Sequence, residues 1–389
     1  MAALSIVLLP VPAQSGMLSR VFPRPDSQIP MAFSPTFGRL ALMAMVAAPL
    51  GLASAQGSCG GARAGAPACD TTPAKLPFAP TGWKTVALDH FSMQAADYRK
   101  EAAYYATLMN WKMRSDDGTK AVMDIGDIGS AVIRGGFQAP PPPPPPTAAD
   151  SAAGRAGRGG GRGARAPRQV VWDSFCWVIS PWNARTVEAE LKKRGLDPVA
   201  DNDGKFESFH VKDPDGFDVQ ISNDAHLAMR KGTPANAPLP APAPFANTDW
   251  KTVWLDHISF EVSNYKESAA FYIALLGWKP TGDEGSQNEL EMGDVGNVIV
   301  RGGNPATFTA GSPPPRRVSI GHVSFGFTPW DTDKVKAELD ARGLTGRPDT
   351  GNKGDIHDAA ALYKSYHTTT PSGFDLQISN ASKANRTVR

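Results

Sequence analysis

The chain has 389 residues, 41% of them hydrophobic, which is enough for two or more domains with sizeable cores. Its formal net charge is only +2, and the positive excess lies largely in one Arg/Gly-rich segment, 155–168. The composition therefore gives no reason to expect a strongly acidic or basic partner.

The chain begins with a predicted targeting segment, residues 1–55. Arg39 precedes an uncharged apolar run, 40–52, and Ala53-Ser54-Ala55 then has the A-x-A pattern of a signal-peptide cleavage site. The run is shorter than the about 20 apolar residues that span a bilayer. We therefore expect export to the periplasm or the extracellular space, with no membrane association after cleavage. Met31 is an alternative start, and a buried helix is the competing interpretation.

The three cysteines fall into two groups. Cys59 and Cys69 lie in segment 56–79, which we expect to be flexible, and an exported protein would allow them to form one short-loop disulfide. Cys176 lies in an apolar run with no activating group around it. We expect it to be a small buried side chain rather than a nucleophile.

An internal repeat divides the rest of the chain. Residues 83–90 (WKTVALDH) recur as 250–257 (WKTVWLDH), an offset of 257 − 90 = 167. Near the end of each copy, 216–223 (GFDVQISN) match 373–380 (GFDLQISN). Such self-similarity predicts two copies of one domain. Their bounds, with the linker between them and the final tail, are predicted to be 80–225, 226–247 (Ala/Pro-rich linker), 248–381 and 382–389 (tail).

Each copy shows the pattern of a strand, a helix and further strands, and shows it twice. In the second copy the first helix is expected over 265–276, with Ser263 or Asn264 as its cap and Gly277 as its left-handed end. Asn110 stands where the first copy needs the same left-handed residue. The other elements are expected at 253–262, 277–281, 289–293, 297–302 and 319–327 (strands), from 331 or 332 to 342 (helix), and at 361–367 and 374–379 (strands). The fold class is therefore predicted to be α+β, with four βαβββ modules in two pairs.

An insert at 139–167 separates the two modules of the first copy. It combines a proline run, 140–146, with Arg residues among Gly and Ala, and neither part can build a core. Arg-Gly segments can bind nucleic acid, but this one has no aromatic side chains for base stacking. We expect a flexible loop between modules and no nucleic-acid partner.

A duplicated βαβββ unit with a His on its first strand and a turn such as 213–216 (DPDG) or 370–373 (TPSG) before its last strand resembles the vicinal oxygen chelate superfamily. That superfamily contains glyoxalase I, bleomycin-resistance proteins and extradiol dioxygenases. The resemblance covers about 81–223 and 248–380. It implies that the two modules of each copy form a cup around a divalent metal ion, Fe(II) or Mn(II) in preference to Zn(II) or Ni(II).

The resemblance also implies a ligand set in the second copy, His257, His322 and Gln377. Two imidazoles and one oxygen donor leave open positions for a bidentate substrate. The family usually has Glu at the position of Gln377, and an amide brings no charge, so metal affinity is expected to fall. The extradiol pattern has a hydrogen-bonding Tyr where this chain has His367, which is therefore expected to be catalytic, as a donor to an oxyanion or a carrier of a proton.

The first copy is expected to hold only a degenerate site, formed by His90, Ser174, Gln220 and His210, because Ser174 stands where the second copy has His322. Two-domain extradiol dioxygenases have likewise lost the metal from their first domain. For every His the competing interpretation is a hydrogen-bonded core residue, and for each Gln a hydrogen-bonding group in the cavity. Asp89 and Asp256 precede a strand His, so simple alternation predicts that they lie on the opposite, solvated face.

Two classes of function follow. One is a metal-dependent enzyme of the extradiol (catechol-type) dioxygenase or isomerase type, acting on a small vicinal-oxygen substrate in the second cup. The other is a non-catalytic small-molecule binding protein of the bleomycin-resistance type. A glyoxalase-like lyase is a further alternative, against which the strand at 298–301 (VIVR) counts because it offers no carboxylate. The oligomeric state is not predicted.

Overall fold

The computed structural model describes residues 72–138, 168–303, 316, 318–351 and 353–385. The predicted signal segment, the Cys59–Cys69 pair and the insert 139–167 lie outside the described residues. Those that are described all belong to one compact unit, 55–389. Among the described helices, none is long and apolar enough to cross a membrane.

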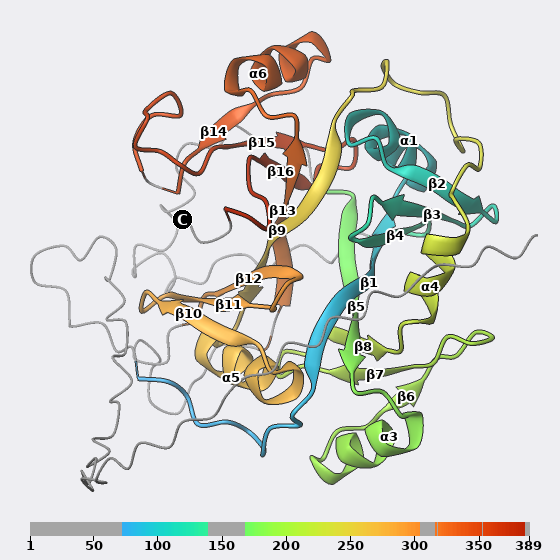
Figure 1. Ribbon diagram of the computed structural model, residues 1–389, viewed down its shortest axis with the longest axis vertical. Helices are drawn as coiled ribbons and strands as arrows, with labels where there is room; N and C mark the ends of the chain where they lie inside the picture. Colours follow the sequence, from blue (N-terminus) through green and yellow to red (C-terminus); the bar gives the residue numbers. More distant parts are fainter. Residues whose placement is uncertain (1–71, 139–167, 304–315, 317, 352, 386–389) are drawn as a thin grey trace, which may run out of the picture. The chain divides into compact units, whose positions relative to one another are not determined.

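The first copy folds into a mixed sheet of eight strands in the order β2-β3-β4-β1-β5-β8-β7-β6 (Figure 1). In chain order its elements are β1 (Lys84–Ala95), α1 (Tyr98–Leu108), β2 (Lys112–Asp116), β3 (Lys120–Ile125), β4 (Gly129–Arg134), β5 (Val170–Ser180), α3 (Ala184–Lys193), β6 (Val199–Ala200), β7 (Ser208–Lys212) and β8 (Asp218–Ser222).

The second copy repeats this sheet in the equivalent order, β10-β11-β12-β9-β13-β16-β15-β14. Its elements are β9 (Lys251–Val262), α5 (Tyr265–Leu276), β10 (Lys279–Asp283), β11 (Gln287–Glu291), β12 (Gly296–Arg301), β13 (Val318–Thr328), α6 (Thr332–Ala341), β14 (Arg347–Asp349), β15 (Ser365–Thr369) and β16 (Asp375–Ser379).

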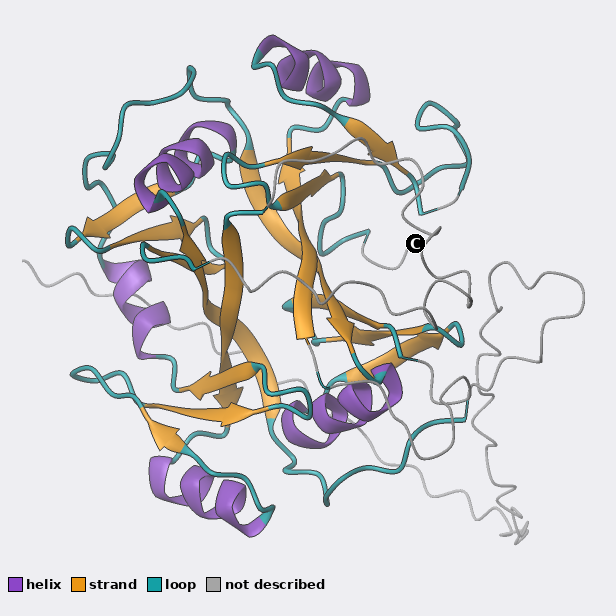
Figure 2. Cartoon of the chain, turned by 180° about the vertical axis from the view of Figure 1, so that it is seen from behind, coloured by secondary structure: helices purple, strands orange, loops and turns teal. Residues whose placement is uncertain are grey.

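Each sheet consists of two βαβββ modules joined by their first strands. β1 pairs antiparallel with β5, and β9 pairs antiparallel with β13. Each of α1, α3, α5 and α6 lies beside strands of its own module (Figures 1 and 2). The predicted α+β fold with four modules in two pairs is confirmed.

The helix ends follow the predicted chemistry. The side chain of Asn264 accepts a hydrogen bond from the Glu267 backbone and caps α5. Gly277 ends α5 in the left-handed conformation with φ of 68°. Asn110, at the equivalent place after α1, has φ of 56°.

Two segments differ from the prediction. The strand expected over 361–367 begins only at Ser365, because 353–364 form an irregular loop with turns such as the one closed by the hydrogen bond from the Ala361 N–H to the Asp358 carbonyl. The linker expected over 226–247 begins as a helix, α4 (Ala225–Gly232). Its sequence, AHLAMRKG, contains good helix formers that the Ala/Pro content of the longer segment masked.

The two sheets share one hydrophobic core that is rich in aromatic rings. Trp172 of the first copy stacks on Phe374 of the second with ring centroids 4.9 Å apart. The Trp111 indole donates to Thr252 over 2.9 Å, and its equivalent Trp278 donates to Thr85 over 2.9 Å. Because the core uses one face of each sheet, the other face is available to polar side chains. We call the face bearing His90 and Gln220 the first cup and the face bearing His257 and Gln377 the second cup.

Candidate metal centre and ligand cavity

The second cup brings together the two predicted imidazole ligands. His257 lies on β9 and His322 on the adjacent antiparallel strand β13, and their Nε2 atoms are 2.8 Å apart. Two nitrogens bound to one ion at about 2.1 Å each, and about 90° apart, would be separated by about 3.0 Å. The strand pairing has therefore placed both nitrogens at a separation that a single ion can bridge.

Both imidazoles are neutral at physiological pH. Burial lowers the pKa of His257 to about 3 and the pKa of His322 to about 2, and the positive charges of Arg301 and His367 act in the same direction. Neutral imidazole is the form that ligates metals. The other ring nitrogen of His257, Nδ1, lies 3.3 Å from the Asp256 carboxylate but forms no hydrogen bond with it.

Gln377 lies in the second cup with its amide orientation determined by its neighbours. Its Nε2 donates to the hydroxyls of Ser365 (2.8 Å) and Tyr363 (3.0 Å). These hydroxyls donate their own protons elsewhere, Ser365 to the carbonyl of Asp349 and Tyr363 to the carboxylate of Asp256. They can therefore only accept from Gln377. Its buried Oε1 has no hydrogen-bond partner among the described residues and is available as a ligand.

This donor set fits a divalent ion, although it contains no carboxylate. Among the described residues, no Asp or Glu joins His257 and His322 to form a compact group of three His, Cys, Asp or Glu donors. The third protein donor would have to be the Oε1 atom of Gln377, which brings no charge. Two imidazoles and an amide oxygen are thus the donors that the second cup offers.

His367 is held between two carboxylates. Its Nδ1 is 2.9 Å from Asp375 and its Nε2 is 3.3 Å from Asp349, while its ring centroid is 5.0 Å from that of His322. Burial lowers the pKa of His367, but the hydrogen bonds and charges of Asp349 and Asp375 outweigh this effect, so the pKa is raised. The Nε2 proton can reach a bound molecule only if it leaves Asp349, whose side chain is 41% exposed.

A cavity of about 490 Å³ lies near one end of β9 and β13. Its lining includes Glu261, Arg301 and Ser319 but none of the predicted ligands of the second cup. Ser319 pairs with Glu261 in the same ladder in which His322 pairs with Ser259, so the cavity lies further along these strands than the histidine pair. The half-buried Arg301 is a cation at its wall.

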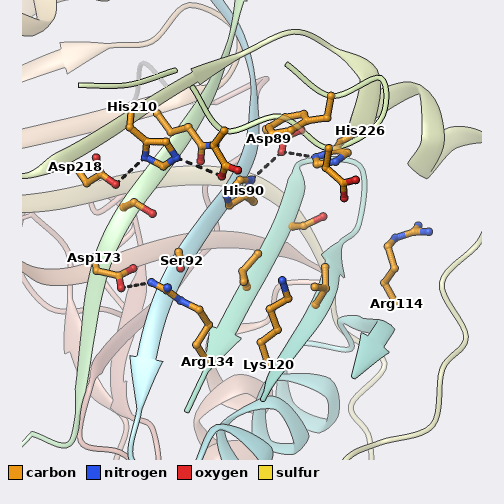
Figure 3. Close-up of a pocket in the computed structure, with 18 of the residues that line it drawn as sticks. Asp89, His90, Ser92, Arg114, Lys120, Arg134, Asp173, His210, Asp218 and His226 are labelled. Atoms are coloured by element: carbon orange, nitrogen blue, oxygen red, sulfur yellow. Dashed lines mark hydrogen bonds and ion pairs between the residues drawn. The ribbon is translucent and has the colours of Figure 1, made fainter. Parts of the chain in front are cut away.

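The first cup contains a larger cavity, of about 710 Å³ (Figure 3). All four residues predicted for the first site line it: His90, Ser174, Gln220 and His210. The strand register confirms that Ser174 occupies the place of His322, since Ser174 pairs with Asp218 as His322 pairs with Asp375.

The hydrogen bonds of Gln220 and His210 resemble those of their counterparts in the second cup. Gln220 donates to the Ser208 hydroxyl over 2.8 Å. His210 lies 2.8 Å from Asp218 and 3.5 Å from Asp201. Burial lowers the pKa of His210, but the two carboxylates raise it above its usual value overall.

The prediction that Asp89 and Asp256 are solvated is wrong. Both are buried, 0% and 1% exposed. A register shift between Leu88 and His90 in the β1–β5 ladder interrupts the alternation of faces, and a matching shift lies between Leu255 and His257 in the β9–β13 ladder. Such a bulge lets consecutive side chains face the same cavity. Asp89 and His90 consequently both line the first cup.

Three residues at the first cup were missed as site residues: Asp89, His226 and Arg230. The Asp89 Oδ2 atom lies 2.8 Å from His90 Nδ1 and 3.0 Å from His226 Nδ1. The Arg230 guanidinium lies 3.6 Å from the other oxygen, Oδ1. Burial raises the pKa of Asp89, but the two histidine hydrogen bonds and charges hold it well below its usual range. His226 and Arg230 come from α4, and the only sequence signal was the helix-forming run within the linker.

The comparisons with known proteins agree with this fold. Residues 254–378 match the family model described as the Glyoxalase/Bleomycin resistance protein/Dioxygenase superfamily. No match was found among curated proteins. The match covers most of the second copy, so the resemblance to the vicinal oxygen chelate superfamily is confirmed.

Several solved structures are similar over most of both chains. The Mn(II)-bound glyoxalase from Novosphingobium aromaticivorans is 16% identical over 76% of this chain and 82% of that chain, with a TM-score of 0.50. The 2,3-dioxygenase LapB from Pseudomonas sp. KL28 is 13% identical over 76% and 92%, with a TM-score of 0.50. Homoprotocatechuate 2,3-dioxygenase from Brevibacterium fuscum, in complex with 3,4-dihydroxyphenylacetate, is 15% identical over 79% and 84%, with a TM-score of 0.50. At these identities the likeness establishes the fold alone.

Proposed function

We propose that this protein is a divalent-metal-dependent enzyme of the extradiol dioxygenase type, with its metal in the second cup and a small vicinal-oxygen compound as substrate. The observation that carries the proposal is the 2.8 Å approach of the buried Nε2 atoms of His257 and His322. The free Oε1 atom of Gln377 supports it. The similar solved structures include a Mn(II)-bound glyoxalase and 2,3-dioxygenases, which favours Fe(II) or Mn(II) over Zn(II) or Ni(II).

Each residue of the second cup then has a definite part. His257, His322 and Gln377 would hold the ion, which would supply Lewis acidity and, as Fe(II), the capacity to bind O2 next to a chelated diol. Asp256, 3.3 Å from Nδ1 of His257, would orient this ring after a small shift. His367 would give the Nε2 proton to a substrate oxygen after leaving Asp349. Arg301, at the cavity wall, would attract an anionic group of the substrate.

The experiment is metal analysis of the purified protein, loaded anaerobically with Fe(II), Mn(II) or Zn(II). We expect His257→Ala and His322→Ala each to lose one ion per chain. His357→Ala is the matched control, because His357 lies in an exposed loop, where its side chain is 3.7 Å from Asp333. Uptake in the two cup variants equal to that of the control would contradict the proposal. A catechol cleavage screen of the Fe(II)-loaded protein then tests the reaction.

A second candidate function is metal-free binding of a small molecule, as in bleomycin-resistance proteins. The larger cavity, in the first cup, favours this candidate, because Ser174 stands there at the position of His322 and the pair of imidazoles seen in the second cup is absent. Ligand binding that persists after chelation and in His322→Ala would support this candidate. A glyoxalase-like lyase is less consistent with the structure, because β12 offers no carboxylate to the second cup. The side chains of β12 on that face are Asn297, Ile299 and Arg301.

We further propose that the protein is exported. This proposal rests on the sequence of residues 39–55. N-terminal sequencing of the protein from the cells that make it tests the proposal. A mature chain beginning at Gln56 is the expected result, and retention of the apolar run in the isolated protein is the contrary one.

A further inference from the structure

The first cup contains a set of donor atoms, from Asp89, His90 and His226, that the ligand pattern implied by the resemblance does not combine. We propose that it binds a second divalent transition-metal ion through Asp89 Oδ2, His90 Nδ1 and His226 Nδ1. Among the described residues, these three form a group whose donor atoms all lie within 4.8 Å of one another. The proposal concerns a different cup and different ligands from the proposed function and does not depend on it.

The distances within the group suit one ion. His90 Nδ1 and His226 Nδ1 lie 2.8 Å and 3.0 Å from the same carboxylate oxygen of Asp89. Donors bound at about 2.1 Å and about 90° apart would be separated by about 3.0 Å. Figure 3 shows both imidazoles directed at this carboxylate. Small shifts of the side chains would be enough to admit an ion between them.

The donor types select the class of ion. Two imidazoles and one carboxylate suit first-row transition metals such as Fe(II), Co(II) or Zn(II), whereas Mg2+ and Ca2+ prefer oxygen donors. Three protein ligands leave positions open to the cavity of about 710 Å³, which all three residues line. The carboxylate that the second cup lacks among its predicted ligands is therefore present here.

The third ligand is held in place before any ion binds. The His226 ring stacks on Phe206 with centroids 3.9 Å apart and planes within 4°. Arg114 donates to the carbonyl of Thr233 just after α4, and Arg230 of α4 donates to Ser130. Because helix and ring are both fixed, little freedom is lost when the ion binds.

The competing explanation is a purely structural ion pair between Asp89 and Arg230. Arg230 approaches Oδ1 at 3.6 Å, whereas both imidazoles converge on Oδ2. An ion on Oδ2 would therefore leave the Arg230 contact in place. It would replace the two Nδ1 protons, which would move to Nε2 or be released.

The second copy shows that the fold does not require this arrangement. Asp256, the equivalent of Asp89, accepts hydrogen bonds from the hydroxyls of Ser324, Tyr363 and Ser379. In the first copy Cys176 stands at the position of Ser324. Asp89 has thus exchanged hydroxyl partners for imidazoles, which can bind a metal ion.

Co(II) titration of the chelator-treated full chain tests the proposal, followed by visible absorption and by metal analysis after gel filtration. His226→Ala is the test variant, because its side chain is 32% exposed and its loss leaves the sheet intact. Met229→Ala, on the same helix and lining the same cavity, is the control. We expect His226→Ala to lose one ion and its absorption bands, with affinity reduced at least about 100-fold, and Met229→Ala to keep both.

His322→Ala separates this proposal from the proposed function. If both hold, the wild type binds two ions, and His226→Ala and His322→Ala each bind one. If only the first cup binds, the wild type binds one ion and His322→Ala still binds it. His90→Ala is a second variant that should reproduce the loss. Unchanged stoichiometry and spectrum in both His226→Ala and His90→Ala would overturn the proposal.

Discussion

The two cups have the same strand order and the same register, yet their polar residues differ. In the first cup the buried aspartate contacts two imidazoles and a guanidinium, and a cavity of about 710 Å³ lies over it. In the second cup the equivalent aspartate contacts three hydroxyls, and the paired imidazoles lie beside it. The shared aromatic core therefore preserves the fold, while the polar residues of the two cups can differ.

Loop length explains part of this difference. Ser208 follows Asp201 by seven positions, whereas the equivalent Ser365 follows Asp349 by sixteen. The longer loop of the second copy carries Tyr363 to Asp256 and Gln377. The first copy has no such residue in its shorter loop, and α4 instead brings His226 and Arg230 to its cup. Each cup is thus completed by a segment outside the repeated strands, a helix in the first copy and a loop in the second.

The largest expected effect is the loss of metal from His322→Ala. Removing one of two imidazoles should lower the affinity of the second cup for Fe(II) or Mn(II) by at least about 100-fold. Isothermal titration of the chelator-treated protein measures it. Ser174→Ala, the matched change in the first copy, should leave metal affinity in both cups unchanged, and an equal loss in Ser174→Ala would break the comparison.

The next effect distinguishes two roles of the Gln377 amide, its Oε1 as a metal ligand and its Nε2 as a hydrogen-bond donor. A carboxylate cannot donate to Ser365 and Tyr363, so Gln377→Glu should destabilise the metal-free protein by about 2 to 3 kcal/mol. The same carboxylate should bind a divalent ion more tightly, so the metal-loaded variant should regain stability. Thermal unfolding with and without Mn(II) measures both effects. Gln220→Glu should show the destabilisation, and Mn(II) should stabilise it no more than it stabilises the wild type; a larger gain there would argue against the assignment.

Tyr363→Phe should have a smaller effect, because Asp256 keeps two other hydroxyl partners. We expect the free energy of unfolding to fall by about 1.5 kcal/mol, through loss of a hydrogen bond to a charged group. Urea denaturation measures this change. Tyr366→Phe, on the adjoining strand β15, is the control, and an equal loss there would mean that Tyr363 has no special role in the second cup.

The smallest effect is a pH dependence at His210. Asp218 and Asp201 raise the pKa of His210 in the folded protein above its usual value of 6.5. A raised folded pKa stabilises the protein below pH 6.5, and this contribution is lost as the pH rises through the folded pKa. Compared with His210→Gln, the wild type should lose less than about 1 kcal/mol between pH 6 and 9, because the group is partly solvated. If the free energy of unfolding changed with pH by the same amount in both proteins, this interpretation would be wrong.

The fold could be predicted from the sequence because repeat and periodicity agree. The repeat at an offset of 167 predicted two copies of one domain, and the residues Asn264 and Gly277 predicted where α5 begins and ends. The loop 353–364 was misjudged because Tyr363 and its neighbours have strand-forming side chains but serve the cup rather than the ladder.

The site could be predicted only in part. His257 and His322 could be paired because they hold the same place in two modules whose first strands adjoin. The aspartates were misplaced because a β-bulge cannot be read from alternation. His226 was missed because a contact between a linker helix and β1 depends on tertiary packing, of which the local sequence carries no signal.

Anomalous diffraction from crystals grown with Mn(II) or Co(II) tests the central claim, that the second cup is a metal centre, most directly. We predict a peak between the Nε2 atoms of His257 and His322, within ligand distance of the Oε1 atom of Gln377. Full occupancy elsewhere with no density at this position would contradict the account, because the imidazoles would then be a hydrogen-bonded pair.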